Sequence, residues 1–126
     1  MPQISLEYSS NIQDVTNFKQ LFSAIHHVIH TSGRVLIENC KSRAICHKTY
    51  FIGQGNPMNA FIHLEVQWLE GRSTELKSQI GNELLSLLKK YYHSSMQQQN
   101  LQITVHIIDI NRDSYFKLPK GSFTIL

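Results

Sequence analysis

Long apolar runs are absent from this sequence. No stretch approaches the roughly 20 consecutive apolar residues that a helix needs to cross a bilayer. The first residues also lack the basic segment followed by an apolar run that marks a signal peptide. We therefore expect no membrane partner and a cytoplasmic location. With 41% hydrophobic and 17% charged residues, the chain is expected to form a single domain, residues 1–126, around one core.

Cysteine is scarce. The sequence has two cysteines, Cys40 and Cys46, and both fall on one segment that we predict to be extended. A strand of that length separates their Cα atoms by roughly 20 Å, whereas a disulfide allows at most about 7 Å. We therefore expect two free thiols in a reducing compartment. Two thiols are also too few ligands for a cysteine-based metal site.

A dense run of positive charge is also absent. Twelve Lys and Arg residues against nine Asp and Glu give a net charge of +3, and the basic residues occur singly or in pairs. Nucleic-acid binding favours a denser basic stripe with interleaved aromatic residues. We therefore expect no nucleic-acid partner. The small positive excess is compatible with a small anionic substrate.

Two kinds of periodicity follow each other in the first half of the chain. Residues 4–8 alternate between apolar and polar, which is typical of a half-buried strand. Apolar residues then recur every three or four positions between 18 and 29, which predicts an amphipathic helix. Gly33 suits the left-handed conformation that ends many helices. Residues 34–52 are predicted to be extended, before a loop of sequence GQGNP.

The second half repeats this order. Residues 60–68 alternate, and Ser73 is a favourable N-cap for a helix whose apolar stripe runs from Leu76 to Tyr91. After the polar letters QQQN, residues 101–110 form the last predicted strand. The letters match as well, because ISLEY and IHLEV lie 58 positions apart and the same offset superimposes the two helical stripes. We therefore predict an internal repeat, about residues 2–52 and 59–111.

These elements predict an α/β (α+β) fold. It has duplicated β-α-β units that form a four-stranded sheet with two helices on one face. The right-handed crossover rule makes each unit a parallel pair of strands. The other face of the sheet would then be polar and would meet solvent or line a wet cavity between subunits. The residues on that face are Ser5, Glu7, His63, Glu65, Gln67, Thr104 and His106.

Six short motifs lie in order along nearly the whole chain. They are Met1-Pro2 before a strand, Ser9-Ser10-Asn11-Ile12, Ser42-Arg43, Ala60-Phe61-Ile62-His63, Gly71-Arg72-Ser73 and Phe116-Lys117. Together they resemble the 5-carboxymethyl-2-hydroxymuconate isomerases of the tautomerase superfamily. The resemblance implies a cofactor-free isomerase of aromatic-compound (homoprotocatechuate) degradation, in which Met1 is removed and the secondary amine of Pro2 carries a proton. It also implies a homotrimer with active sites near the subunit boundaries.

The chemistry of a free N-terminal proline fits that role. An α-amino group has a pKa near ~8, and partial burial or nearby cations lower it. A base works best with a pKa close to the working pH. Arg72, Lys41 and Arg43 are the candidate cations, and they are also candidates to bind the carboxylates of a di- or tricarboxylate substrate. The family pattern has arginine where Lys41 stands, and lysine lacks the bidentate fork, so the substrate and the choice between Lys41 and Arg43 stay open.

Two further interpretations concern the histidines of the first predicted helix and the function of the whole domain. His26 and His30 stand one helical turn apart beside His27, but no carboxylate or further histidine completes a zinc pattern there. We therefore predict no metal. The alternative function is a non-catalytic ferredoxin-like binding or assembly module, because ferredoxin-like domains share this order of elements. That function gives Pro2 no role, and a retained Met1 would favour it.

Overall fold

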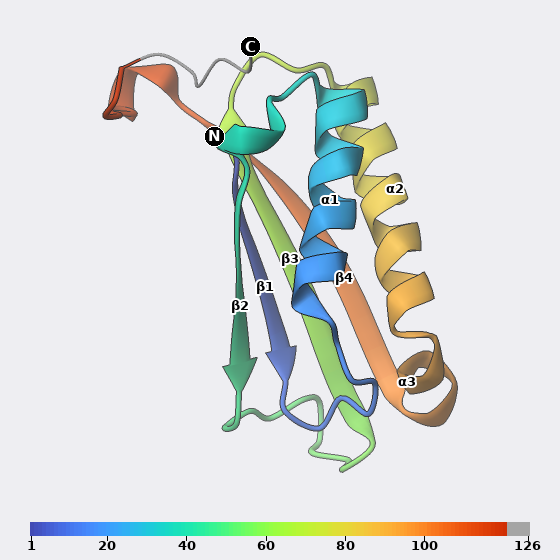
Figure 1. Ribbon diagram of the computed structural model, residues 1–126. Helices are drawn as coiled ribbons and strands as arrows, with labels where there is room; N and C mark the ends of the chain where they lie inside the picture. Colours follow the sequence, from blue (N-terminus) through green and yellow to red (C-terminus); the bar gives the residue numbers. More distant parts are fainter. Residues whose placement is uncertain (121–126) are drawn as a thin grey trace.

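The computed structural model describes residues 1–120, which form a four-stranded mixed sheet with helices on one face (Figure 1). The elements are β1 (Gln3–Ser9), α1 (Phe18–Gly33), a 3-10 turn (Ile37–Asn39), β2 (Lys41–His47), β3 (Asn59–Leu69), α2 (Thr74–Tyr91), α3 (His93–Gln98), β4 (Asn100–Ile110) and a second 3-10 turn (Arg112–Ser114). The strand order is β2-β1-β3-β4. β1 pairs with β2 and β3 with β4 in parallel, and β1 meets β3 antiparallel. The predicted pair of β-α-β units is confirmed.

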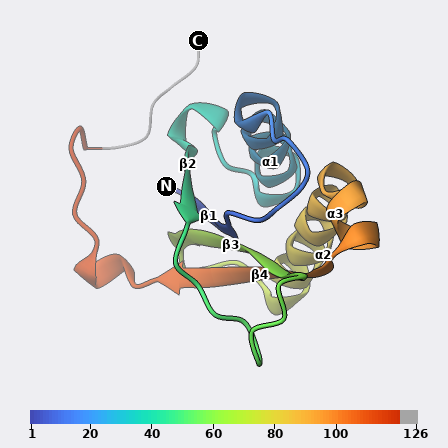
Figure 2. The ribbon, with the colours of Figure 1, turned by 90° about the horizontal axis from the view of Figure 1, so that it is seen from below.

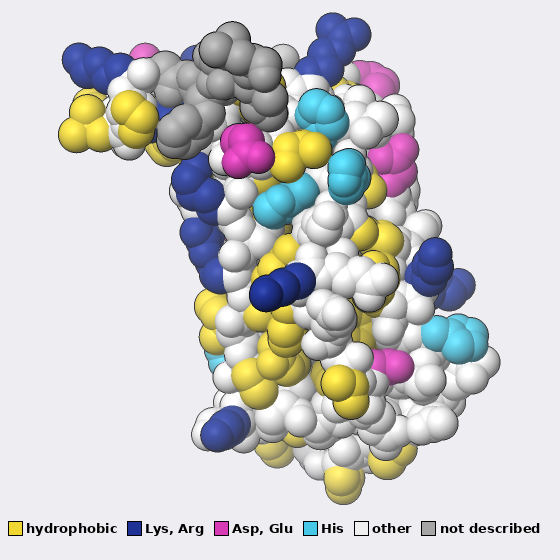
Figure 3. Space-filling view, viewed as in Figure 1, with side chains coloured by type: hydrophobic (Ala, Val, Ile, Leu, Met, Phe, Trp, Pro, Cys, Tyr) yellow, Lys and Arg dark blue, Asp and Glu magenta, His cyan; other side chains and the backbone are white. Residues whose placement is uncertain are grey.

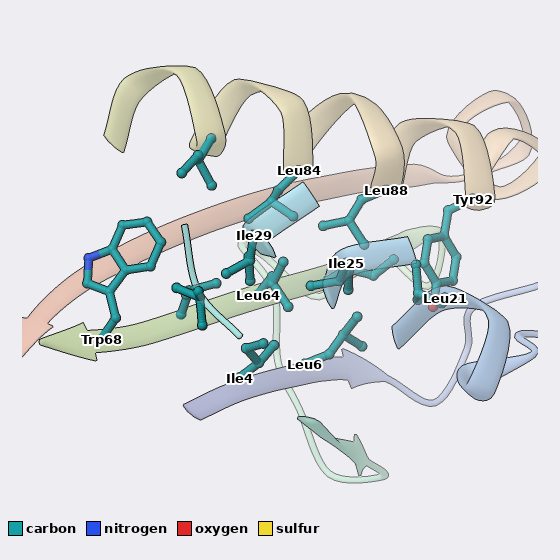
Figure 4. Close-up of a cluster of buried hydrophobic side chains, with 14 of the residues drawn as sticks. Ile4, Leu6, Leu21, Ile25, Ile29, Leu64, Trp68, Leu84, Leu88 and Tyr92 are labelled. Carbon is teal, nitrogen blue, oxygen red and sulfur yellow. The ribbon is translucent and has the colours of Figure 1, made fainter. Parts of the chain in front are cut away.

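The core lies between the sheet and the two long helices (Figure 4). Alternate residues of β3 are fully buried, as the period of two predicted. Each long helix buries one residue per turn against them, because positions four apart lie on the same face. Trp68 closes one end of this layer and Tyr92 the other (Figure 4). The helix residues that are fully buried are Leu21, Ile25, Ile29, Ile80, Leu84 and Leu88.

The end of α1 differs from the prediction. Gly33 remains helical, and Arg34 takes the left-handed conformation, with φ 55° and ψ 45°. Gly33 is buried at the contact of α1 with α2 and β3, and a Cβ there would meet Ile80 Cδ1 at 3.4 Å and Trp68 Cζ3 at 3.6 Å, which is ordinary van der Waals contact. Its carbonyl oxygen accepts hydrogen bonds from Arg72 Nε and Nη2 (3.3 and 3.2 Å), which anchor this last residue of the helix. The turn out of the helix falls to the exposed Arg34.

The segment 34–52 is less extended than predicted. The backbone N–H of Asn39 donates to Leu36 O (3.0 Å) and that of Cys40 to Ile37 O (3.0 Å), which makes a 3-10 turn before β2 begins. Pairing with β1 then ends at His47. The QQQN stretch also differs, since two of its glutamines belong to α3. These short turns depend on tertiary packing, to which hydrophobic periodicity gives no guide.

A polar network joins the two β-α-β units at the end of the sheet where β1 finishes (Figure 1). The N–H groups of Gln13 and Asp14 donate to Ser95 Oγ (3.2 and 3.1 Å), and the N–H of Ser95 donates to Asp14 Oδ2 (2.7 Å). Gln99 Nε2 donates to Asn11 O (2.9 Å). These partners lie 81 to 88 positions apart in the sequence. The network therefore ties the loop before α1 to α3.

All three helices lie on one side of the sheet (Figure 2), so the opposite face carries no helical cover within residues 1–120. That face holds the partly exposed side chains of Glu7, His63 and Glu65 and the exposed side chains of Thr104 and His106. It is the polar face predicted from the alternation. Within the described part of the chain, no helix has the length and apolar character needed to span a membrane.

Candidate active site

A cavity of about 200 Å³ lies at the end of the sheet where β1 begins and β3 ends. We call it the N-terminal pocket. It is lined by Met1, Asn39, Trp68 and three arginines, Arg34, Arg72 and Arg112, together with apolar residues. The same three arginines also line an adjoining shallower hollow of about 610 Å³. This concentration of positive charge favours an anionic ligand.

The start of the chain reaches this pocket. The α-amino group of Met1 has its pKa lowered from 8.0 to about 6, first by partial burial and then by the positive charges of Lys41 and Lys117. Pro2 is buried directly behind it. The carbonyl oxygen of Pro2 accepts a hydrogen bond from the Lys41 N–H (3.2 Å). This backbone pairing sets Lys41 beside the chain start.

Arg72 is held in a fixed orientation. It follows Gly71, whose φ of 127° is a conformation that glycine adopts without strain. Its guanidinium stacks 4.4 Å from the centre of the Trp68 ring. Its Nη1 donates to Leu69 O (3.1 Å), while Nε and Nη2 donate to Gly33 O (3.3 and 3.2 Å). Burial and the nearby Arg112 lower the pKa of Arg72.

Three of the five N–H groups of Arg72 are therefore committed to carbonyl oxygens among the described residues. The other two are left for a ligand. A planar donor group that packing and hydrogen bonds already orient loses little freedom when it binds a carboxylate. The geometry thus gives Arg72 two functions, which are to support the fold and to present donors to the pocket.

The other two predicted cations lie on β2, along the edge of the sheet where Figure 3 shows a line of basic side chains. Lys41 Nζ donates to Asn39 O (3.0 Å). Lys41 also lines a separate hollow of about 370 Å³ with Gln3 and residues 115–119. Arg43 shares its face of the strand but donates to the Gln3 side chain. The structure therefore brings Pro2, Lys41 and Arg72 to the same end of the sheet and leaves Arg43 one step further along β2.

Three residues of the pocket were not indicated by sequence patterns. Arg34 follows α1, and Arg112 is held by Glu70, whose Oε2 accepts from the Arg112 N–H (2.8 Å). Asn39 is 5% exposed, and its Oδ1 has no hydrogen-bond partner among the described residues. Buried polar atoms are normally paired, so an unpaired one beside a cavity is a candidate ligand contact. The parallel register that sets Leu69 opposite Ile110 is the signal that places Arg112 near Arg72.

The helical histidines serve local contacts. His26 Nε2 lies 2.7 Å from Ser42 Oγ, and His30 Nδ1 donates to Val35 O (2.7 Å). His27 is exposed on the surface of α1. The structure therefore does not bring these three side chains together as one ligand set.

The fold and the site define a class of protein. Two β-α-β units that share one four-stranded sheet have the architecture of the tautomerase superfamily of isomerases. The family model described as 5-carboxymethyl-2-hydroxymuconate isomerase matches residues 2–120. The chain therefore belongs to the 5-carboxymethyl-2-hydroxymuconate isomerase family, and it is an isomerase of that superfamily. This membership does not favour a non-catalytic binding or assembly module.

Individual relatives agree with this assignment. The chain is 25% identical to the 5-carboxymethyl-2-hydroxymuconate Delta-isomerase of Escherichia coli over 117 residues, which is 93% of each chain. A crystal structure of a 5-carboxymethyl-2-hydroxymuconate isomerase from Deinococcus radiodurans R1 is similar with a TM-score of 0.84 and 24% identity, over 92% of this chain and 87% of the other. A symmetric trimer described as fused 4-OT shares the fold with a TM-score of 0.72 and 15% identity, over 95% and 94%.

Proposed function

We propose that this isomerase uses the amine of Pro2, exposed after removal of Met1, as the proton carrier in a cofactor-free isomerisation. The proposed substrate is an unsaturated 2-hydroxy or 2-oxo di- or tricarboxylate, and 5-carboxymethyl-2-hydroxymuconate is the first to test because it occurs in the names of the family and of the Escherichia coli relative. The observation that carries the proposal is the chain start itself. With Met1 present, the α-amine of the chain has a lowered pKa, and Met1 lines a pocket with three arginines.

The pocket suits proton transfer along a substrate. A neutral amine accepts the proton of the 2-hydroxyl group as the C2–O bond becomes a carbonyl. The amine then returns a proton to a carbon atom of the substrate as the double bond shifts. No atom is gained or lost, so the reaction needs no co-reactant. Burial and the charge of Lys41, the causes that lower the pKa of the Met1 amine, favour the neutral form of the base at neutral pH.

The cationic side chains have two roles in this proposal, which are to bind the substrate carboxylates and to stabilise negative charge that develops on the substrate. Arg72, with two donors left after its carbonyl contacts, binds a substrate carboxylate. Lys41, next to the chain start, stabilises negative charge that develops on the 2-oxygen. Arg43 is the remaining candidate for a second carboxylate, from its position on the same face of β2. Arg34 and Arg112 raise the positive potential of the pocket.

The decisive experiment measures isomerisation by ultraviolet absorbance with protein whose mass shows that Met1 is absent. Pro2→Ala is expected to lower kcat about 100-fold, the usual contribution of a positioned acid–base group. The matched control is Pro57→Ala, which changes an exposed loop proline and is expected to leave kcat unchanged. Full activity in protein that retains Met1 would refute the role of the free N-terminal amine. Wild-type rates from Pro2→Ala, which keeps a primary N-terminal amine, would refute the role of the secondary amine of proline.

The assembly proposed for this isomerase is a homotrimer with its helices outward. The uncovered polar face and the exposed edge strand β2 support it, because such surfaces favour pairing with another copy. The trimeric architecture of a structure with the same fold also supports it. Sedimentation and activity across one dilution series test it, and a fully active monomer contradicts it.

The remaining expectations concern the setting of the enzyme. We infer a cytoplasmic location, which the two free cysteines support. A single domain over residues 1–126 also stays a prediction, and its last six residues lie outside the described part of the chain. The absence of nucleic-acid and membrane partners also stays a prediction.

A further inference from the structure

Two histidines and a glutamate meet on the sheet face that the helices leave uncovered. His63 and Glu65 are two positions apart on β3, so their side chains point to the same side. His106 stands on β4 directly opposite Glu65 in the parallel register. One ligand atom from each of the three residues lies within 4.8 Å of the other two. We call these three residues the β3–β4 cluster.

The distances within this cluster suit a small cation. His63 Nε2 lies 3.4 Å from Glu65 Oε2. In a tetrahedral zinc site with bonds of about 2.0–2.2 Å, neighbouring ligand atoms lie about 3.3–3.5 Å apart. The pair is therefore already at ligand spacing. The ring centre of the exposed His106 is 6.5 Å from that of His63, and a side-chain rotation would bring its ligand nitrogen from within 4.8 Å to ligand spacing.

Neighbouring side chains orient two of the three ligands. His63 Nδ1 is 2.6 Å from Thr104 Oγ1, and when Nδ1 carries the proton it donates to that hydroxyl and leaves the lone pair of Nε2 facing Glu65. Gln67 Nε2 donates to Glu65 Oε1 (3.0 Å), which leaves Oε2 on the side of His63. Metal-binding histidines and carboxylates usually have such outer partners. A lone pair and a carboxylate oxygen that face each other are stabilised by a cation between them.

We propose, in contrast to the prediction from the sequence that the chain binds no metal, that the β3–β4 cluster is a binding site for a divalent transition-metal ion of the zinc type. Two imidazole nitrogens and one carboxylate oxygen select such ions over calcium or magnesium, which prefer oxygen ligands alone. Three protein ligands leave at least one coordination position to water. All three ligands come from one chain, so binding does not require the proposed trimer.

The site is distinct from the N-terminal pocket, whose lining includes none of these residues. It also gives a role to three polar side chains that have none in the proposed isomerase chemistry. A histidine–carboxylate pair alone would account for His63 and Glu65, and a pair of that kind occurs at His47 and Glu7 (2.8 Å). The second imidazole, His106, is what distinguishes the β3–β4 cluster from that pair.

The test is a titration of tag-free protein with Zn²⁺ in which equilibrium dialysis measures the bound ion. Parallel titrations use Ca²⁺ and Mg²⁺. We expect saturable binding of one Zn²⁺ per chain and none of the other two ions. The substitution His106→Gln, at an exposed position, is expected to weaken Zn²⁺ binding at least 10-fold. The double variant H63Q/H106Q is expected to abolish Zn²⁺ binding. Thr104→Val, which removes an outer partner only, is expected to weaken binding about 10-fold.

The matched control is His47→Gln, which removes an imidazole from a similar pair that has no third ligand among residues 1–120. It is expected to leave the number of bound ions and their affinity unchanged. Far-UV circular dichroism checks that each variant is folded. If the double variant does not fold, the Zn²⁺ affinity of His106→Gln alone decides the test. Absent Zn²⁺ binding, an unchanged Zn²⁺ affinity in His106→Gln, or an equal loss of affinity in His47→Gln would overturn the proposal. These outcomes are independent of the isomerase assay, which tests the N-terminal pocket and not the β3–β4 cluster.

Discussion

Replacement of Arg72 by alanine is expected to destabilise the fold, beyond any effect on catalysis. The side chain satisfies two carbonyl oxygens, those of Gly33 and Leu69, and stacks on Trp68. A hydrogen bond contributes about 1 kcal/mol net, and a partly exposed cation–π contact about 0.5–1 kcal/mol. The variant should therefore lose about 2–3 kcal/mol of unfolding free energy. Arg72→Lys keeps the charge over the ring but not the fork, so it should lose about half as much.

Urea denaturation measures this loss. The fluorescence of Trp68, the single tryptophan of the chain, reports the local change, and far-UV circular dichroism reports global unfolding. Arg43→Ala is the control, since Arg43 is exposed and bonds only to the Gln3 side chain among the described residues. It should stay within about 0.5 kcal/mol of wild type, as surface substitutions usually do. An Arg72→Ala variant as stable as wild type would show that the carbonyl contacts contribute nothing.

Three further predictions follow from contacts described above. In protein that retains Met1, the folded amine binds its proton more weakly than the unfolded one, so unfolding free energy should rise with pH between about 6 and 8. Lys41→Gln should raise the pKa of the amine and flatten that rise, and an acetylated N-terminus should remove it. Ser73→Ala should cost about 1 kcal/mol in urea unfolding because Ser73 Oγ accepts the Leu76 N–H (3.1 Å); an unchanged midpoint would contradict this. Gly33→Ala should be neutral or stabilise by up to about 1 kcal/mol, whereas Gly33→Val should destabilise, since the next atoms begin at 3.4 Å.

Local periodicity explains why the fold could be predicted. Alternation in residues 60–68 and the apolar stripes of the two long helices depend on neighbours a few positions away, and the structure confirms all three. The ends of elements depend on distant partners instead. The end of α1 is an example, because the carbonyl oxygen of Gly33 is bound by Arg72, which lies 39 positions away in the other β-α-β unit.

The N-terminal pocket shows the same limit. Its arginines come from three segments, after α1, after β3 and after β4, which meet only in the folded chain. Sequence motifs indicated Arg72 but gave no reason to single out Arg34 or Arg112. Neither did they show that Arg72 is bound to carbonyl oxygens. The roles of Pro2, Arg72, Lys41 and Arg43 in catalysis stay predictions for the assays above.

The network between the loop before α1 and α3 has a consequence during synthesis. Its partners are separated by 81 to 88 residues. At about 5–20 residues per second, Ser95 leaves the ribosome roughly 4–16 s after Asp14. β1 likewise waits for β3, its antiparallel partner, before Ile4 and Leu6 are enclosed from both sides. For several seconds the nascent first unit is therefore expected to expose the apolar surface that the second unit later covers.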